Sequence, residues 1–247
     1  MRKTFEIFWN SFLFAVQELR KNKLRTFLSL LGITFGIFCI ISVMATVGSL
    51  ESSIKNEFKT FGNNTIYVQK WPWGGGGDYP WWKYVNRPNS KFKEVAPVKE
   101  RMSLAGNVAY TYFNASSIDY NDVSLASVSW YGITEEFSVI QPVEIGWGRY
   151  LSSNEFAYGT ASVVMGFNVA EKLFDKPEYA LGKAVTIKGR KVNVIGIIKK
   201  QGQNLLGGWD FDNVIMIPYR FASQIGNENR SDGFLIVKGK ENVPVED

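Results

Sequence analysis

The sequence predicts an α+β protein in which one membrane helix precedes a domain of mixed sheets. The first observation is the segment Thr26–Leu50, which has 25 residues and contains neither charge nor proline. As an α-helix it is about 37 Å long, enough to cross a hydrocarbon core of about 30 Å. The second is that β-rich runs bounded by Asn, Ser and Asp dominate after Val95, with short helical patterns between them.

An amphipathic helix is predicted over residues 2–24. Phe5, Phe8, Trp9 and Phe12 recur at three- and four-residue spacing, and polar side chains occupy the opposite face. A helix of this kind next to a membrane span favours the membrane interface, so residues 1–25 are assigned to the cytoplasmic-side surface of the bilayer. Packing on a soluble partner domain is the alternative.

Basic residues concentrate just before the apolar run and set the predicted topology. Residues 1–25 contain six basic and two acidic residues, which is +4 of the net charge of +5. The basic residues closest to the run are Arg20, Lys21, Lys23 and Arg25. By the positive-inside rule the N-terminus is cytoplasmic and residues 51–247 are extracytoplasmic. The run is too long for a signal-peptide core and is read as an uncleaved anchor. A charge placed this way does not indicate nucleic-acid binding.

The predicted membrane helix (26–50) carries small residues that favour helix–helix packing. Gly32 and Gly36 form a GxxxG pattern. Such glycines let two membrane helices approach closely, although glycine is also common in membrane helices that do not associate.

A tryptophan-rich stretch follows the first predicted strand of the outer domain. Trp71, Trp73, Trp81 and Trp82 flank the glycine run 74–77 and two prolines, so no regular element is expected there. The rings are a possible ligand or partner surface, for example for a sugar or an aromatic drug. The alternatives are that they fold against the domain or lie at the level of lipid headgroups.

Several element boundaries are predicted in the outer domain. Separate strands are expected at Ala105–Asn114 and Ile118–Tyr120, and a short helix capped by Thr134 is expected to end at Ile140. Residues Gly146–Arg149 are expected to form a turn. The four residues Lys188–Lys191 are expected to join two hairpin strands.

The sequence contains no constellation of residues that indicates catalysis. It has no histidine and a single cysteine, Cys39, so His-based triads, His metal sites and an intrachain disulfide are excluded. Leu181–Ala184 contains a Gly-Lys pair but lacks the other residues of a phosphate-binding loop. We therefore expect no enzyme activity and no catalytic, metal or cofactor-binding site.

An ordered series of short motifs resembles the MacB/LolE/FtsX-type ABC transporter permeases. The motifs are Leu19–Ile33, Phe61–Val68, Tyr131–Phe137, Ile145–Leu151, Val163–Gly166, Ala170–Phe174, Leu181–Lys183, Val194–Ile197 and Asp212–Pro218. The resemblance implies that residues 51–247 are similar to the extracytoplasmic core domain of this family, an α+β domain with two lobes. It also implies that five residues shape turns and domain packing, namely Gly132, Gly148, Arg149, Gly182 and Gly196.

The resemblance implies a transport function. Such permeases dimerise in a bacterial inner membrane, work with a separate cytoplasmic ABC ATPase and sometimes a periplasmic adaptor protein, and drive export or other periplasmic work. The family has three further membrane helices after the outer domain, so we expect this chain to be the N-terminal portion of a permease, with a core domain incomplete at its C-terminal end. The alternative is a single-pass anchored binding or sensor module that uses the tryptophan-rich stretch as its contact surface.

Overall fold

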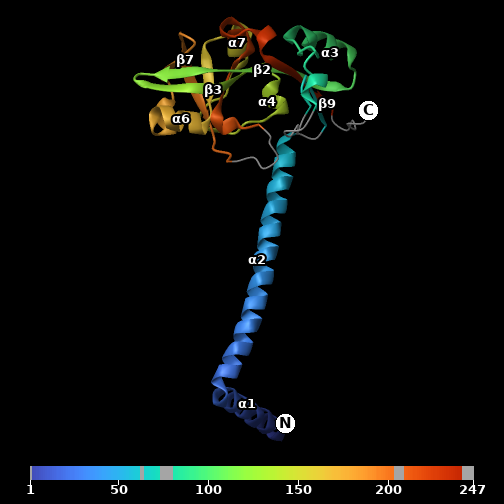
Figure 1. Ribbon diagram of the computed structural model, residues 1–247, viewed down its shortest axis with the longest axis vertical. Coiled ribbons are helices and arrows are strands. Elements are labelled where there is room, and N and C mark those ends of the chain that lie inside the picture. The colour runs from blue at the N-terminus through green and yellow to red at the C-terminus, as the bar shows by residue number, and fades with distance from the viewer. Residues whose placement is uncertain (1, 62–63, 73–79, 203–208, 241–247) are drawn as a thin grey trace. The chain divides into compact units, whose positions relative to one another are not determined.

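A computed structural model of the chain describes residues 2–61, 64–72, 80–202 and 209–240 (Figure 1). The chain divides into two compact units, Met1–Lys55 and Asn56–Asp247.

The first unit consists of two helices. Helix α1 (Arg2–Lys21) confirms the predicted amphipathic helix, and Phe5, Trp9 and Phe12 are exposed on it. A turn at Asn22 separates α1 from helix α2 (Lys23–Phe61). The location of α1 in the membrane interface stays a prediction.

Helix α2 has the length and composition of a membrane span. Its residues Lys23–Ile54 are the only helical segment among the described residues that is long and apolar enough to cross a bilayer. The most apolar part of this segment has a mean hydropathy of 2.4, and none of it is buried. The hydroxyl groups of Thr34 and Thr46 donate to the carbonyl oxygens four residues earlier, each at 2.8 Å. Their polar groups are therefore satisfied inside the helix, as a hydrocarbon environment requires.

The second unit is built on one mixed sheet of nine strands. Its strands are β1 (Thr65–Val68), β2 (Ala105–Tyr120), β3 (Val123–Ile133), β4 (Ile145–Gly148), β5 (Ser162–Met165), β6 (Ala184–Ile187), β7 (Arg190–Ile198), β8 (Val214–Pro218) and β9 (Asp232–Gly239). The pairs β3–β8 and β5–β7 are parallel and the other pairs are antiparallel. Because β6 pairs with both β2 and β7, the strands β2, β3, β8, β5, β7 and β6 form a closed ring.

Short helices cover this sheet. They are α3 (Val95–Arg101), α4 (Phe137–Ile140), α5 (Ser153–Tyr158), α6 (Phe167–Phe174) and α7 (Tyr219–Ile225), with 3₁₀ turns η1 (Trp81–Lys83), η2 (Phe92–Glu94), η3 (Pro177–Ala180), η4 (Phe211–Asn213) and η5 (Glu228–Arg230). The predicted α+β class is confirmed.

Two hydrophobic clusters pack on opposite sides of the strands. In β8, Ile215 and Ile217 belong to the first cluster, whereas Val214 and Met216 belong to the second. This alternation follows the two-residue repeat of a strand. Helices α6 and α7 complete the first cluster, while α4 and α5 complete the second. Both clusters lie within the unit Asn56–Asp247, which is not divided further, so one sheet joins the regions expected to form two lobes.

Three predicted boundaries are wrong. The two strands expected at Ala105–Asn114 and Ile118–Tyr120 are one strand, β2, with a register shift between Ser116 and Ile118. The polar residues between them occupy the bulge and do not end the strand.

The turn expected at Gly146–Arg149 is largely the strand β4, which pairs with the last three residues of β7. The cap expected at Thr134 is also wrong, because α4 begins at Phe137 after Glu136. The Thr134 hydroxyl instead accepts a hydrogen bond from the backbone N–H of Tyr110 at 3.0 Å.

The hairpin expected at Lys188–Lys191 is present but tighter than predicted. Ile187 pairs with Arg190, so only Lys188 and Gly189 form the turn, with φ of 47° and 76°. Two successive positive φ angles are typical of the turns that join closely twisted strands.

Candidate functional site

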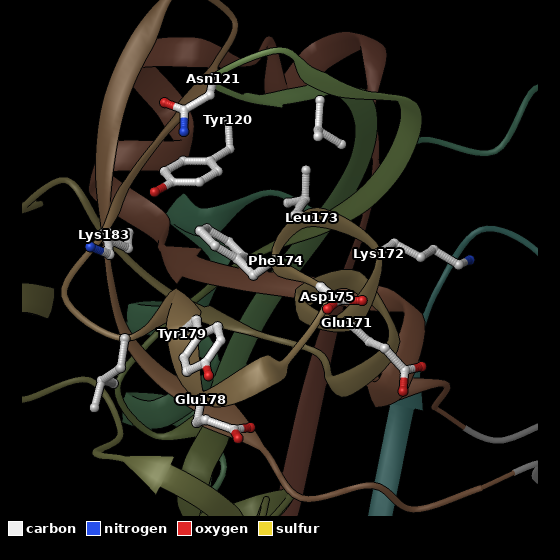
Figure 2. A pocket seen from close by; sticks show the side chains of 12 residues that line it. Tyr120, Asn121, Glu171, Lys172, Leu173, Phe174, Asp175, Glu178, Tyr179 and Lys183 are labelled. Atoms are coloured by element: carbon white, nitrogen blue, oxygen red, sulfur yellow. The ribbon is translucent and has the colours of Figure 1, made fainter.

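A groove with a volume of about 730 Å³ lies between the tip of the β2–β3 hairpin and the end of α6 (Figure 2). The residues that line it are Tyr120, Asn121, Val123, Glu171, Lys172, Leu173, Phe174, Asp175, Glu178, Tyr179, Leu181 and Lys183. The groove is open to solvent and offers an aromatic floor with charged side chains around it.

Each wall of the groove contains a residue with a positive φ angle that turns the chain. At the hairpin tip Asn121 takes a φ of 49°, a conformation that asparagine tolerates better than most residues. Helix α6 ends at Phe174, and Asp175 turns the chain with a φ of 66° before Pro177 begins η3. The rings of Tyr120 and Phe174 meet at 4.2 Å between centroids and join the two walls.

The groove carries both signs of charge. Glu171, Asp175 and Glu178 contribute carboxylates and Lys172 and Lys183 contribute ammonium groups. Among the described residues there is no group of three or more His, Cys, Asp and Glu side chains placed to hold a metal ion. Concave shape, aromatic side chains and mixed charge are features of a binding surface.

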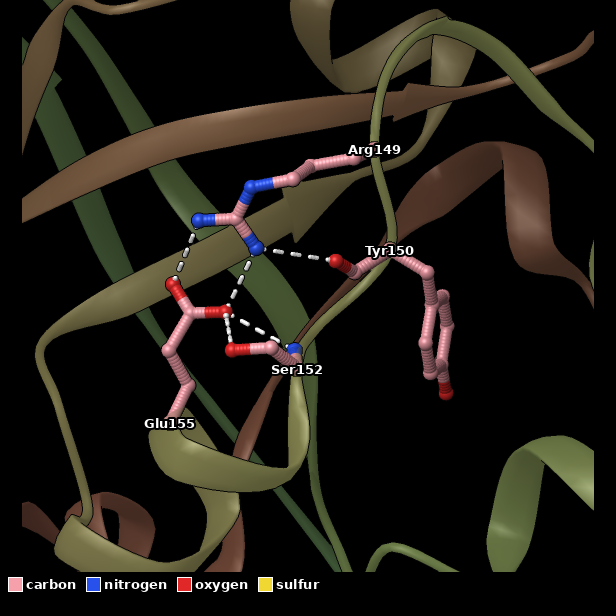
Figure 3. Close-up of polar contacts among 4 residues, drawn as sticks. All are labelled: Arg149, Tyr150, Ser152 and Glu155. Carbon is pink, nitrogen blue, oxygen red and sulfur yellow. Dashed lines mark hydrogen bonds and ion pairs between the residues drawn. The ribbon is translucent and has the colours of Figure 1, made fainter.

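Arg149 lies at the centre of a polar junction between β4 and α5 (Figure 3). Its guanidinium holds the Glu155 carboxylate with two hydrogen bonds, at 2.6 Å and 3.1 Å, and donates a third to the carbonyl oxygen of Tyr150 at 3.1 Å. Ser152 donates to the same carboxylate from its backbone N–H and its hydroxyl, each at 2.8 Å. The α5 N-terminus is therefore fixed by a capping box whose acid is also held by arginine.

The charge distribution of this junction keeps Glu155 ionised. The side chain of Glu155 is 10% exposed and that of Arg149 is 57% exposed. The hydrogen bonds from Arg149, followed by those from Ser152, lower the pKa of Glu155 to about 2 against the opposing effect of burial.

Two of the predicted glycines, Gly148 and Gly196, pack closely beside Arg149, and Gly182 lies next to Leu181, which Gly148 approaches. An added Cβ at Gly196 would overlap the backbone carbonyl of Arg149, and one at Gly148 would overlap the carbonyl of Ile195 and the side chain of Leu181. The backbone N–H of Arg149 donates to the same Ile195 carbonyl at 3.0 Å. Gly182 follows Leu181, and its backbone N–H donates to the carbonyl oxygen of Val194 in β7 at 2.8 Å.

Gly132 lies apart from this junction, in β3. An added Cβ there would meet the side chains of Ala222 in α7 and Tyr112 in β2. The absence of a side chain at this position lets α7 pack directly on the sheet.

The tryptophan-rich stretch is only partly described. Trp71 is half-buried, and the Lys70 ammonium lies 5.1 Å from the centre of its ring. Trp81 and Trp82 are exposed side by side, with ring centroids 6.1 Å apart. Trp73 lies outside the described residues.

Sequence reasoning missed a tyrosine cluster beside α7. Tyr219 donates to Glu228 at 3.0 Å, and Glu228 also accepts from the backbone N–H of Phe92 at 2.8 Å. Tyr110 and Tyr112 contact the Tyr219 ring. Burial raises the pKa values of Tyr110, Tyr112 and Tyr219 above the ordinary value, and the charge of Glu228 adds to the shift. The sequence could have predicted part of this cluster, because Tyr110 and Tyr112 are two residues apart in a strand and their rings therefore share one face.

The role of Asp212 was also missed, although the residue opens one of the family-like motifs. Its buried carboxylate accepts backbone hydrogen bonds from Gln201 and Gly202 at 2.8 to 3.1 Å. This contact fastens the chain that leaves β7 to the start of β8.

Comparisons with known proteins agree on one family. The family model for the MacB-like periplasmic core domain matches residues 26–247. A macrolide export ATP-binding/permease protein, MacB, from Neisseria gonorrhoeae is 28% identical over 246 residues, covering 97% of this chain and 36% of that protein. An uncharacterized ABC transporter permease, YvrN, from Bacillus subtilis is 29% identical over 194 residues, covering 76% of this chain and 46% of that protein. The chain thus spans between about a third and a half of the length of these relatives.

Two solved structures share the fold. The periplasmic region of MacB from Actinobacillus actinomycetemcomitans aligns with a TM-score of 0.59 at 20% identity, covering 75% of this chain and 78% of that one. The extracellular domain of the noncanonic ABC-type transporter YknZ from Gram-positive bacteria aligns with a TM-score of 0.55 at 19% identity, covering 72% and 85%.

The glycines at the Arg149 junction allow a matched test of packing. Gly148 and Gly182 both have positive φ, of 80° and 74°, but only an alanine at Gly148 meets other atoms. We expect Gly182→Ala to lower the free energy of unfolding by about 1 kcal/mol through backbone strain alone. Gly148→Ala is expected to lower it by about 3 kcal/mol or more, since overlap adds to strain. Thermal unfolding of the whole chain in nanodiscs, followed by tryptophan fluorescence, measures both; equal losses would contradict the overlap.

The Arg149–Glu155 pair predicts a pH-dependent loss of stability in Arg149→Met. At pH 7 the variant is expected to be less stable by about 1–2 kcal/mol, a modest value because Arg149 is more than half exposed. Glu155 has a lowered folded-state pKa, so the contribution of the pair is present above its ordinary value of 4.5 and is lost as pH falls toward about 2. The difference between wild type and variant should therefore shrink over this window.

Lys199→Met is the matched control for this pair. It breaks the pair Lys199–Glu144, whose side chains are 60% and 69% exposed, and should change stability little at any pH. A loss in Arg149→Met that stays constant between pH 7 and pH 3 would refute the assigned role of Glu155.

Proposed function

The chain belongs to the family of MacB-like periplasmic core domains, and on this premise we propose that it is the N-terminal part of a permease subunit of an ABC transporter. The observation that carries the proposal is the continuity of this domain with a helix of membrane-spanning length. The outer domain acts on a substrate or a partner outside the cytoplasm, and the energy comes from ATP hydrolysed by another polypeptide.

Helix α2 is the mechanical link in this proposal. It has 39 residues and is therefore about 58 Å long, roughly twice the thickness of a hydrocarbon core. A continuous helix is stiff because each backbone N–H is bonded four residues back. Movement of the membrane segment is passed along α2 to the domain that follows it.

The basic residues before the span support an orientation. Arg20, Lys21, Lys23 and Arg25 lie at the α1–α2 junction, whereas the charges just after the span nearly cancel. The N-terminus is cytoplasmic, α1 lies along the inner surface of the plasma membrane, and the second unit is periplasmic or extracellular.

A second permease copy is the proposed partner within the membrane. Gly32, Gly36 and Cys39 follow one another at four- and three-residue spacing and share one face of α2. Among the described residues, no atom beyond the neighbouring backbone of α2 lies within 4 Å of an added Cβ at either glycine, so this face carries no contact from them. Close approach of two such faces is the packing expected of small residues in lipid.

The groove beside α6 is the proposed contact surface for a substrate or an adaptor protein. Its aromatic and charged side chains come from two stretches of the chain, 120–123 and 171–183, which together give a surface of varied chemistry. The same groove also favours the second candidate function, an anchored binding module that works without an ATPase.

Co-purification with an ATPase separates the two candidates. The full-length protein is extracted from its own cells in mild detergent and photolabelled with 8-azido-ATP. The permease proposal expects label on a co-purifying polypeptide, and residues 1–247 contain no phosphate-binding loop that would take the label. A lone monomer without a labelled partner would favour the anchored binding module.

Cys39 offers a direct test of the dimer. Oxidation with copper phenanthroline in native membranes is expected to give a disulfide-linked band at twice the mass of the protein. Gly36→Leu should reduce the band several-fold by separating the two helices. Ile41→Phe, on the opposite face of α2, is the matched control and should leave it unchanged. Equal yields in the two variants would exclude this face as the interface.

A further inference from the structure

Aromatic and basic side chains stand exposed on the second unit in and just after the 3₁₀ turn η1. The set consists of Trp81, Trp82, Lys83, Val85 and Arg87, and is called the aromatic–basic patch. Trp81 is 55% exposed and Trp82 is 61% exposed. Two adjacent tryptophans with more than half of their surface in water are costly for a soluble domain and commonly mark a binding surface.

The patch is presented by an ordered segment. Backbone hydrogen bonds within η1 and the turn after it hold Lys83, Tyr84, Val85 and Arg87 at 2.9 to 3.1 Å. The guanidinium of Arg87 lies 4.4 Å from the centre of the Tyr84 ring.

The chain just after the patch is fastened to α7, to η5 and to the strand β2. Phe92 stacks on Tyr219 at 4.2 Å, and its N–H donates to Glu228. Asn89 donates to the carbonyl of Ser231 at 2.9 Å, and the hydroxyl of Tyr110 donates to the carbonyl of Ser90 at 3.2 Å. The exposed rings are therefore held in place by contacts in which they take no part.

The ring geometry and the charge narrow the choice of ligand. The rings of Trp81 and Trp82 meet edge to face at 82°, so they do not form the flat platform on which a sugar stacks. Residues 80–93 contain four basic residues and no acidic residue. Tryptophans close to several lysine and arginine residues are the combination favoured where apolar lipid meets anionic headgroups.

We propose that the aromatic–basic patch binds the headgroup region of an anionic bilayer. Trp81, Trp82 and Val85 enter the boundary between headgroups and acyl chains, while Lys83 and Arg87 pair with lipid phosphates. The inference needs only a membrane-anchored chain and does not depend on the transport function.

The dimensions of the chain permit this contact. Helix α2 continues eleven residues beyond Leu50, a rise of about 16 Å. A folded unit of this length has a radius of gyration of about 16 Å and is therefore roughly 40 Å across. A surface on the unit is thus within reach of the bilayer that the same chain crosses.

Fluorescence quenching by labelled lipid tests the contact. In a Cys39→Ser background, which removes the only native cysteine, Val85→Cys carries an NBD fluorophore and the whole chain is placed in nanodiscs. The lipids are phosphatidylcholine with or without phosphatidylglycerol, plus a headgroup nitroxide lipid. Tyr158→Cys is the matched control site, because Tyr158 is 80% exposed on α5 of the same unit.

Strong quenching at position 85 and weak quenching at position 158 are expected in the anionic nanodiscs. Lys83→Gln with Arg87→Gln should lower the population in contact by about tenfold or more in phosphatidylglycerol, and high salt should act in the same direction. Trp81→Ala with Trp82→Ala should reduce quenching in both lipids.

Two results would overturn the proposal. One is equal quenching at positions 85 and 158 in anionic nanodiscs, repeated with the label at Asn86→Cys so that loss of Val85 is not the cause. The other is quenching at position 85 that is the same in both lipids and is unchanged by Lys83→Gln with Arg87→Gln and by Trp81→Ala with Trp82→Ala. Either result would leave an acidic protein surface as the occupant of the patch.

Discussion

The pairing of β2 with three different strands is the constraint on which the second unit depends. Its first part pairs with β9, most of its length pairs with β3, and its last residues pair with β6. The register shift at Ser116–Ile118 lies where β6 begins to pair, so the bend at the bulge allows the ring to close. A slip of one residue would exchange the two hydrophobic clusters, because side chains alternate between the faces. The Arg149 junction and the groove both depend on this register, through β7 and the β2–β3 tip respectively.

The sequence predicted the parts of the fold that local pattern determines. The charge-free run of α2, the amphipathic α1, the β6–β7 hairpin and α7 each follow from spacing or turn chemistry within a few residues. The wrong element boundaries arose where contacts with residues far away in the sequence determine the structure. Polar Ser116 suggests a strand end, but it pairs with Val128 of β3 and the strand continues to residues that also pair with β6. Gly146–Gly148 suggests a turn, but β7 supplies a pairing partner. Thr134 was assigned to a helix cap but bonds to Tyr110 on another strand.

The candidate site was only partly accessible from the sequence. Arg149 and four glycines were found through their motifs. Glu155, the partner of Arg149, lies six residues further along the chain, and nothing in the sequence indicates that its carboxylate is buried. The groove joins segments separated by some fifty residues, and no local pattern places Tyr120 against Phe174. The tryptophans were recognisable by composition, but whether their rings fold inward or face water depends on the anchoring contacts of Phe92, Asn89 and Ser90.

The two proposals together constrain how movement reaches the outer unit. A stiff helix attached at one point transmits displacement along its axis but leaves the unit that it carries free to tilt. A second attachment through Trp81, Trp82 and the cations beside them would remove part of that freedom, because a tilt that lifts the patch from the headgroups loses both apolar contact and charge pairing. Axial movement of α2 would then act as a lever on the groove beside α6 instead of translating the whole unit. The strength of such a lever depends on lipid charge, so the composition of the bilayer would tune the work of the outer unit without any change in the protein.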